Sequence, residues 1–210
     1  MIEKNRYSYV SPSRFSEISQ FVSASDRRFI EFGCASGETL NEIIRLNASN
    51  QVLGFDLNVN KNIKFDVYEC DMDDFDFDKY SLKLKEADIF LFLDVLEHLK
   101  EPWKFINELS SHMKQGSKII ITCPNFSSVR FLQAYIKGEI PLEDFGFFDK
   151  THLRWLTPKS FIKALNNKNF KSYFTFLKSK KIIFRIIQNF WPSRLCSQFT
   201  LILTFEENKS

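Results

Sequence analysis

Short apolar runs alternate along this chain with stretches in which apolar residues recur at helical spacing. Such runs are typical of strands buried on both faces of a sheet, and such stretches are typical of helices packed against it. The pattern predicts helices at 13–23, at 38–46, from 102 to just before 116, from 158 onward, and between the last two strands. It predicts strands at 28–34, 52–56, 64–70, 87–94, 117–124, 170–177 and 199–206. This alternation predicts an α/β fold with a doubly wound, mostly parallel, seven-stranded sheet and helices on both faces.

The alternation breaks at 124–157, a segment rich in aromatic residues that also carries Gly138, Pro141 and Gly146. A connection of this length inside a compact domain usually covers or builds a site. With 210 residues and no linker or repeat, the chain is expected to form one domain, 1–210. Within it, 24–123 would form a ligand-binding half, 124–157 a cover over the site, and 158–210 the completing helices and strands.

Composition narrows the class of protein and its location. Hydrophobic residues make up 44% and charged residues 26% of the chain, values typical of a soluble globular protein. The net charge of +3 gives no sign of DNA binding and little sign of RNA binding. No apolar stretch is long enough to cross a bilayer, and the polar N-terminus does not resemble a signal peptide. Four cysteines without a C-x-x-C pair predict reduced thiols in a cytoplasmic protein: Cys34, Cys70, Cys123 and Cys196.

The residues EFGCASG at 31–37 join the first predicted strand to a helix, and Asp56 ends the second strand. This order predicts a nucleotide-type pocket at the carboxyl edge of a parallel sheet, with Asp56 accepting hydrogen bonds from ribose hydroxyls. The spacing does not fit a dinucleotide, because Ala35 and Glu38 stand where the second and third glycines of G-x-G-x-x-G would be. Glu38 would then place a carboxylate against an incoming phosphate. The acid at Glu31 suits instead a ligand with a cationic end, such as S-adenosylmethionine.

Together with these residues, two later segments make the chain resemble class I S-adenosylmethionine-dependent methyltransferases of types 11 and 23, from about 29 to 176. CDMDDFDF is similar to the family's adenine-binding segment, and the turn DVLEHL is similar to that of ubiquinone-biosynthesis O-methyltransferases. FDKTHLRWLTPKSFIKALNNKNF resembles methyltransferases encoded with surface-polysaccharide genes. The resemblance implies a Rossmann-like fold whose final strand is antiparallel. Ala35 replaces the middle glycine most common in the first motif, a change we expect to be tolerated with less backbone clearance.

The resemblance also implies which residues bind the cofactor. Glu31 and the backbone of 33–37 would hold the methionine portion, beside Asp94 and the reacting methyl group. Asp56 would bind the ribose. Asp71 and the backbone of the next residue would contact the adenine edge, although Asp71 is also a candidate for a solvated acidic loop. With Leu57 or Met72 packing on the adenine, the implied set is Glu31, Gly33, Cys34, Ala35, Gly37, Asp56, Leu57, Asp71, Met72 and Asp94.

Methyl transfer to a hydroxyl needs a base, or a metal that acidifies the hydroxyl, whereas a neutral amine needs neither. Asp94, Glu97 and His98 follow one another at helical spacing in DVLEHL, and His152 comes from the covering segment. Three interpretations stay open. Asp94, His98 and His152 are catalytic, with an imidazole as base; or all four residues bind Mn²⁺, Fe²⁺, Zn²⁺ or Mg²⁺; or the Glu–His pair only orients its loop. The same turn with a later histidine is associated with metal binding in ubiquinone-biosynthesis enzymes and in small-RNA 3′-terminal 2′-O-methyltransferases.

Other side chains have more than one interpretation. The basic amphipathic stretch 180–191, KKIIFRIIQNFW, would pack on the core, lie on an anionic membrane surface or meet a partner protein. His112 is predicted to lie on the surface. Four residues of 124–157 would contact an acceptor by hydrogen bonds or stacking: Arg130, Lys150, Arg154 and Trp155. The aromatic residues would alternatively pack the cover onto the core: Trp155, Phe126, Phe131, Phe147 and Phe148.

We therefore expect an S-adenosylmethionine-dependent methyltransferase that acts on a hydroxyl or amino group of a small molecule, with a sugar or glycan-type acceptor as first choice. One alternative is a quinone-type O-methyltransferase with peripheral membrane contact. Another is a non-catalytic, cofactor-binding partner subunit. A small-RNA methyltransferase ranks behind the sugar-type and quinone-type enzymes because the chain lacks a basic stripe with interleaved aromatic residues.

Overall fold

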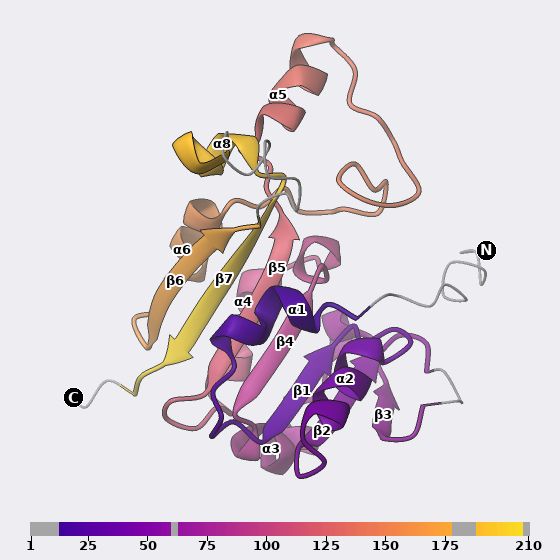
Figure 1. The fold of residues 1–210 in the computed structure, drawn as a ribbon, viewed down its shortest axis with the longest axis vertical. Coiled ribbons are helices and arrows are strands. Elements are labelled where there is room, and N and C mark those ends of the chain that lie inside the picture. Colours follow the sequence, from indigo (N-terminus) through magenta and orange to yellow (C-terminus); the bar gives the residue numbers. More distant parts are fainter. Residues whose placement is uncertain (1–12, 60–62, 178–187, 208–210) are drawn as a thin grey trace.

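The structure, a computed structural model, describes residues 13–59, 63–177 and 188–207. Its centre is a seven-stranded sheet in the order β3-β2-β1-β4-β5-β7-β6 (Figure 1). The strands are β1 (Arg28–Phe32), β2 (Gln51–Asp56), β3 (Asp66–Glu69), β4 (Ile89–Leu93), β5 (Lys118–Pro124), β6 (Phe170–Phe176) and β7 (Gln198–Phe205). The α-helices are α1 (Phe15–Ile18), α2 (Glu38–Leu46), α3 (Phe77–Glu86), α4 (Pro102–Ser110), α5 (Val129–Ile136), α6 (Pro158–Leu165) and α8 (Pro192–Leu195). Short 3-10 turns are η2 (Ser19–Phe21), η3 (Met72–Asp74) and η4 (Leu96–His98).

The strand directions follow the predicted architecture. β1 pairs in parallel with β2 and β4, β2 pairs in parallel with β3, and β4 with β5. β7 runs antiparallel to both β5 and β6. The predicted mostly parallel, seven-stranded sheet with an antiparallel final strand is therefore confirmed. The chain order reverses between β1 and β4, and in such sheets ligands bind at the carboxyl ends of the strands beside the reversal.

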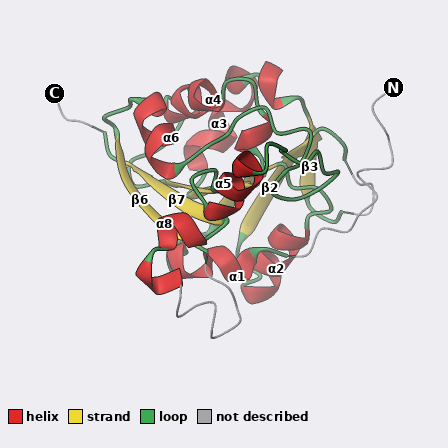
Figure 2. Cartoon of the chain, turned by 90° about the horizontal axis from the view of Figure 1, so that it is seen from above, coloured by secondary structure: helices red, strands yellow, loops and turns green. Residues whose placement is uncertain are grey.

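Apolar side chains fill both faces of the sheet, which explains the continuous apolar runs. β4 is buried at every position, and its Phe92 stacks on Phe32 of β1 with ring centroids 4.8 Å apart. Phe32 also stacks on Phe55 of β2 at 5.0 Å. Helices α3, α4 and α6 cover this face, and α1 and α2 cover the other (Figure 2). The stacked rings tie three neighbouring strands together and so position the loops that follow them.

Two helices of the structure are absent from the sequence prediction. α3 follows the acidic loop directly, and the side chain of Asp76 caps it by accepting a hydrogen bond from Lys79 N at 3.0 Å. Only Tyr80 and Leu84 of α3 are buried, so its apolar stripe is too narrow to stand out in the sequence. α5 lies in the covering segment and buries only Ala134. α3 therefore offers few apolar positions, whereas α5 has several that are exposed in the structure, among them Leu132, Tyr135 and Ile136.

The prediction that His112 lies on the surface is wrong. The residue is buried, its ring stacks on Phe77 with centroids 5.7 Å apart, and its Nδ1 lies 3.1 Å from Ser81 Oγ. Both partners belong to α3. Because the sequence did not reveal this helix, it offered nothing for His112 to pack against.

The covering segment, residues 124–157, extends beyond the carboxyl ends of β4 and β5 (Figure 1). Phe126, Phe147 and Phe148 form a small separate core there with Ala134. The predicted packing role of these aromatic residues is therefore realised. The division of the chain at 124 and 158 into functional parts stays a prediction.

The described C-terminal part contains a short helix between the last two strands, α8, which follows the predicted amphipathic stretch. The amphipathic stretch predicted at 180–191 falls mostly outside the described residues, which resume at 188. Within the described parts of the chain, every helix is too short or too polar to cross a bilayer.

Candidate active site

Two glycines in the loop after β1 have backbone conformations and close neighbours that disfavour any side chain at their positions. Gly33 and Gly37 have φ angles of +73° and +77°, in the left-handed region. A Cβ atom at Gly33 would lie 2.4 Å from Val95 Cγ2, and one at Gly37 would lie 2.7 Å from Phe65 Cζ. Ala35, at φ +48°, adopts the same region, which costs a non-glycine residue about 1–2 kcal/mol. Alanine is thus accommodated in this loop, at the cost of a strained backbone.

Two buried acids flank this loop. Asp56, at the end of β2, accepts hydrogen bonds from Ala35 N at 2.8 Å and from Asn58 N at 3.0 Å. Glu31, on β1, is 4% exposed, and its Oε2 is buried without a hydrogen-bond partner among the described residues. Burial raises the pKa of Glu31 to about 8, although the charge of Arg14 opposes the shift. A buried carboxyl oxygen without a donor is costly, so the arrangement fits a ligand that brings a positively charged donor.

The residues predicted to contact an adenine follow the next strand along the same edge. β2 and β3 are parallel, and Cys70 N donates to Asp56 O at 2.8 Å, which places the acidic loop beside the end of β2. Asp71 is exposed, and its Oδ1 accepts a hydrogen bond from Asp73 N at 2.9 Å. Leu57 is 46% exposed, as a side chain that packs on a ligand must be.

Cys34 and Met72 both pack against the protein. A Cβ atom at Gly54 would lie 2.6 Å from Cys34 Sγ, and burial raises the pKa of this thiol. Met72 is partly buried against the main core. The predicted backbone contacts of both residues with a cofactor are compatible with this packing.

Asp94 is the point at which several parts of the chain meet. It follows β4 with a φ angle of +58°, and its carboxylate accepts a hydrogen bond from Thr122 Oγ1 at 3.1 Å. Gln198 Nε2 donates to both carboxylate oxygens, at 2.7 and 2.9 Å, and Arg14 forms an ion pair with the same group. The sequence analysis missed Arg14 and Gln198, which lie 80 and 104 positions from Asp94. No local pattern marks contacts across such separations.

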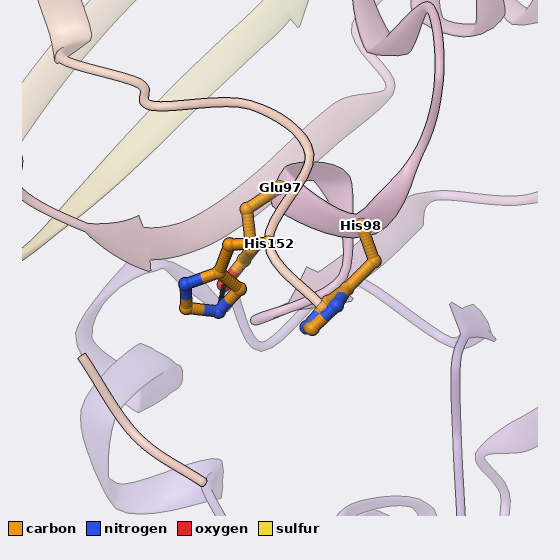
Figure 3. Close-up of side chains that lie close together, drawn as sticks. All are labelled: Glu97, His98 and His152. Carbon is orange, nitrogen blue, oxygen red and sulfur yellow. Dashed lines mark ion pairs between the residues drawn. The ribbon is translucent and has the colours of Figure 1, made fainter. Parts of the chain in front are cut away.

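Two histidines and a glutamate come together at the carboxyl end of β4 (Figure 3). Glu97 and His98 lie on η4, and His152 reaches them from the covering segment. His152 Nε2 lies 3.8 Å from Glu97 Oε1, and the ring centroids of His98 and His152 are 4.8 Å apart. One candidate ligand atom from each of the three lies within 4.8 Å of the others. The structure thus brings together three of the four predicted metal ligands, while Asp94 is held by the contacts described above.

The turn η4 also docks the covering segment through its backbone. The carbonyl oxygen of Glu97 accepts hydrogen bonds from Leu153 N at 2.8 Å and from Arg154 N at 3.0 Å. Because His152 directly precedes these residues, the same pairing positions its imidazole.

The surroundings of Glu97 and His152 shift the pKa of each toward its neutral form. Burial, with the charge of Asp94 added, raises the pKa of Glu97 well above its usual range. Burial, with the charge of His98 added, lowers the pKa of His152. Glu97 Oε2 accepts from Cys123 Sγ at 3.3 Å, but Oε1 has no hydrogen-bond partner among the described residues. The pair can therefore accept a proton at the imidazole, or a cation that ionises the acid.

A cavity of about 260 Å³ opens beside these groups. It lies between the ends of β4 and β5 and the covering segment, and its lining includes Asp94, Glu97, His98, Arg130, Phe147 and His152. A larger hollow of about 480 Å³ runs along η3, α3 and α4. That hollow carries acids and lysines but no histidine, so the smaller cavity is the one that joins the predicted catalytic residues.

Among the residues predicted to contact an acceptor, Arg130 lines this cavity. Its guanidinium lies over the Phe147 ring at 5.2 Å and 3.9 Å from the carboxylate of Glu143. The other three candidates have partners elsewhere: Arg154 Nε with Lys100 O at 2.6 Å, Lys150 with Asp144 at 2.7 Å, and the Trp155 ring with Phe126 at 5.6 Å.

The chain matches a family model described as a methyltransferase domain over residues 4–173. The chain belongs to this methyltransferase family. No curated protein matches the enzyme in sequence. Together, the family and the fold confirm the prediction of a class I S-adenosylmethionine-dependent methyltransferase.

Several solved structures share the fold of the enzyme. A SAM-dependent methyltransferase from Archaeoglobus fulgidus is 21% identical, with a TM-score of 0.58, over 90% of this chain and 91% of that one. The plantazolicin methyltransferase BpumL in complex with SAH is 14% identical, with a TM-score of 0.62, over 91% and 80%. The [4+2]-cyclase SpnF is 13% identical, with a TM-score of 0.59, over 92% and 82%. Since a cyclase is among them, the fold alone does not set the reaction or its acceptor.

Proposed function

We propose that the enzyme transfers a methyl group to a hydroxyl of a small, sugar or glycan-type acceptor bound in the cavity beside His98 and His152. The observation that carries this proposal is the position of both imidazoles in one polar cavity that also reaches Asp94. A hydroxyl needs its proton removed during methyl transfer, and two imidazoles are the groups suited to accept it near neutral pH. An amino acceptor is the other possibility kept from the sequence, but it would leave both imidazoles without a role.

The cofactor site proposed here lies along the ends of β1, β2 and β3. The unpartnered Oε2 of Glu31 would receive the ammonium group of S-adenosylmethionine, and the backbone from Gly33 to Gly37 would contact its methionine portion. Asp56 would bind the ribose, and Asp71 the adenine. When bound, S-adenosylmethionine supplies a methyl group on a positively charged sulfur that leaves as a neutral thioether. Cys34, Ala35, Leu57 and Met72 complete the proposed contacts.

Arg14 belongs to the same proposed site, although the sequence did not reveal it. Its guanidinium pairs with Asp94 and Glu17, and its charge acts on Glu31. A cation in this position offers a partner to the carboxylate of the methionine portion. Asp94 and Arg14, which carry opposite charges, would then both lie beside the reacting end of the cofactor.

The proposed proton transfer runs from the acceptor hydroxyl to an imidazole. As the hydroxyl oxygen forms its bond to the methyl carbon, the oxygen–hydrogen bond breaks and the proton moves to His98 or His152. Burial keeps His152 neutral and so able to accept the proton. Burial raises the pKa of Glu97 and so favours its protonated form, which makes it a poorer candidate for the base than the imidazoles.

The chemistry of the cavity supports a polar acceptor. Acids, imidazoles and Arg130 form much of its lining, which suits hydroxyl-rich molecules that form several hydrogen bonds. A lipophilic quinone-type acceptor and a non-catalytic partner subunit gain no support from these groups. None of the four cysteines forms a disulfide, which supports the proposed cytoplasmic location.

A divalent cation at Glu97, His98 and His152 is a second candidate for activating the hydroxyl. The convergence of the three ligand atoms and the unpartnered Glu97 Oε1 favour it. Carboxylate and imidazole ligands suit Mn²⁺, Fe²⁺ or Zn²⁺. Titration of the chelator-washed enzyme with Mn²⁺ and Zn²⁺ tests this candidate: saturable binding that Glu97→Gln abolishes supports it, and no binding excludes it.

The proposed acceptor and base are tested together. The enzyme is incubated with labelled S-adenosylmethionine and a panel of sugars, nucleotide sugars and simple amines, and mass spectrometry detects a gain of one methylene unit. His152→Gln should slow transfer to a hydroxyl roughly a hundredfold or more without weakening S-adenosylhomocysteine binding. His112→Gln, at a buried histidine outside the cavity, is the matched control. Transfer to amines alone, or equal rates in both variants, would contradict the proposal.

A further inference from the structure

A hydrogen-bond chain links the covering segment to His98. Thr151 Oγ1 lies 3.0 Å from His98 Nδ1 and donates to Asp149 Oδ1 at 2.6 Å. The backbone carbonyl oxygen of Thr151 lies 3.2 Å from the same ring nitrogen. Asp149 Oδ1 also accepts a hydrogen bond from Thr151 N, at 2.8 Å. Two oxygens of one threonine therefore meet one nitrogen of the His98 imidazole.

The direction of each hydrogen bond follows from the groups involved. A carbonyl oxygen can only accept, so its contact requires that Nδ1 of His98 carries the proton. The Thr151 hydroxyl has a single proton, and the short contact with a carboxylate assigns it to Asp149. The hydroxyl oxygen is then left to accept from Nδ1. In a neutral imidazole with its proton on Nδ1, the lone pair is on Nε2.

We infer that Asp149 and Thr151 are positioning residues that fix the proton of His98 on Nδ1 and its lone pair on Nε2. The inference rests on the proposed role of His98 in activating the acceptor hydroxyl. His98 could act as a general base or as a metal ligand, and each role needs the lone pair on Nε2, the ring nitrogen turned away from Thr151. A general base accepts a proton there, and a metal ligand donates its lone pair there.

The chain of hydrogen bonds makes the imidazole dependent on the covering segment. Thr151 is 53 positions from His98 in the sequence. Their contact requires the segment to lie on η4, where the carbonyl oxygen of Glu97 binds Leu153 N and Arg154 N. The segment thus prepares the imidazole for chemistry in addition to covering the cavity.

Nitrogen-15 NMR of the histidine-labelled, chelator-washed enzyme tests the inference at about pH 8, where an ordinary imidazole is neutral. The chain has three histidines, so a His98→Gln sample assigns the signals of His98. The wild type should show a protonated Nδ1 and an unprotonated Nε2. Thr151→Val keeps the shape and the backbone carbonyl oxygen but loses the hydroxyl, one of the two acceptors that hold the proton on Nδ1, so the share of the Nε2-protonated form should grow above that of the wild type. Thr151→Ser keeps the hydroxyl and should retain the wild-type pattern.

A wild-type His98 protonated on Nε2 would overturn the inference. A Thr151→Val variant with an intact amide spectrum and an unchanged tautomer would also overturn it. Should this variant fail to fold, Asp149→Ala provides the second test, because it releases the threonine hydroxyl to donate to Nδ1. The same shift toward Nε2 is expected there, and its absence contradicts the inference. The spectra need no acceptor or cofactor, so their outcome is independent of the test of the proposed function.

Discussion

Buried acids at the edge of the sheet are the residues whose burial most needs an explanation. Glu31 and Glu97 each keep one buried carboxyl oxygen without a hydrogen-bond partner among the described residues. Each such group costs about 1–3 kcal/mol of stability. A cationic ligand that supplies the missing hydrogen-bond partner would offset this cost. Binding such a ligand is the role proposed for both acids.

The pKa of Glu31 predicts a pH dependence of cofactor binding. Burial raises this pKa to about 8, so the carboxyl group is mostly neutral at pH 6 to 7 and must ionise to pair with an ammonium group. Affinity for S-adenosylhomocysteine, measured by calorimetry, should therefore rise from about pH 6 to about pH 7.5, by at most tenfold per pH unit. Glu31→Gln should bind more weakly and lose this slope. A wild-type affinity that stays constant over this range would contradict the assignment.

The same pKa shift has a consequence for folding. The folded-state pKa of Glu31 lies above its ordinary value of about 4.5, so protonation favours the folded state. Its contribution to the unfolding free energy of the ligand-free enzyme is full below about pH 4.5 and is lost as pH rises through about 8. The cofactor, by pairing with the ionised form, would offset this loss.

Substitution of Gly33 separates two costs of a side chain in the glycine loop. A Cβ atom there meets both a left-handed backbone and Val95 Cγ2 at 2.4 Å, whereas Gly116, at φ +82°, has nothing within 4 Å of its added Cβ. Gly116→Ala should lower the unfolding free energy by about 1–2 kcal/mol from strain alone. Gly33→Ala should lower it by about 1–3 kcal/mol more, measured by urea unfolding. Equal losses in the two variants would show that Val95 moves away from the added Cβ atom without a cost in free energy.

At the residue scale, the sequence could predict those site residues whose positions follow from the order of the strands along the chain. Glu31, Gly33 and Asp56 end or follow neighbouring strands, so their order along the chain implies their place at the sheet edge. Arg14 and Thr151 could not be predicted in this way, because their contacts depend on how distant segments fold onto that edge. The roles proposed for all of these residues await their tests.

At the element scale, the C-terminal strand takes part in the site rather than only completing the sheet. β7 supplies Gln198, whose amide donates to both carboxylate oxygens of Asp94. This contact holds Asp94, whose backbone lies in the left-handed region, between β4, β5 and β7. The antiparallel strand thus connects the last part of the chain to the proposed reaction centre.

Removal of this connection should weaken the whole enzyme. Gln198→Leu should lower the unfolding free energy by about 1.5–3 kcal/mol, the value of a hydrogen bond to a charged group. Thr200→Val, on the same strand, is the matched control. Its buried Oγ1 has no hydrogen-bond partner among the described residues, so this change should be neutral or stabilising. Equal unfolding free energies for Gln198→Leu and the wild type would contradict the proposed link.

Helices that bury many apolar side chains were the easier ones to predict. α4 was predicted to begin at Pro102, as it does, and it buries Phe105, Ile106 and Leu109. α3 and α5 bury few side chains and escaped detection. The error at His112 followed from the missing α3, which shows how one undetected element misplaces the residues that pack on it.

At the scale of the whole molecule, one topological feature places the site. The chain order reverses between β1 and β4, so the glycine loop after β1 and Asp94 after β4 lie next to each other. The covering segment extends beyond the carboxyl ends of the strands (Figure 1), and its residues Arg130, Phe147 and His152 line the cavity. The doubly wound sheet was predictable from the alternation of patterns. The cavity proposed for the acceptor was not, because segments far apart in the sequence line it.

Titration with S-adenosylhomocysteine by calorimetry tests the central claim, that acids at the carboxyl edge of the sheet grip the cofactor. Asp56 and Asp88 each accept two backbone N–H groups, but Asp88 precedes β4 and so lies at the opposite edge. Asp56→Asn should weaken binding roughly tenfold to a hundredfold, about 1.5–3 kcal/mol, while Asp88→Asn should bind as the wild type does. Equal affinity in the wild type and Asp56→Asn would contradict the account.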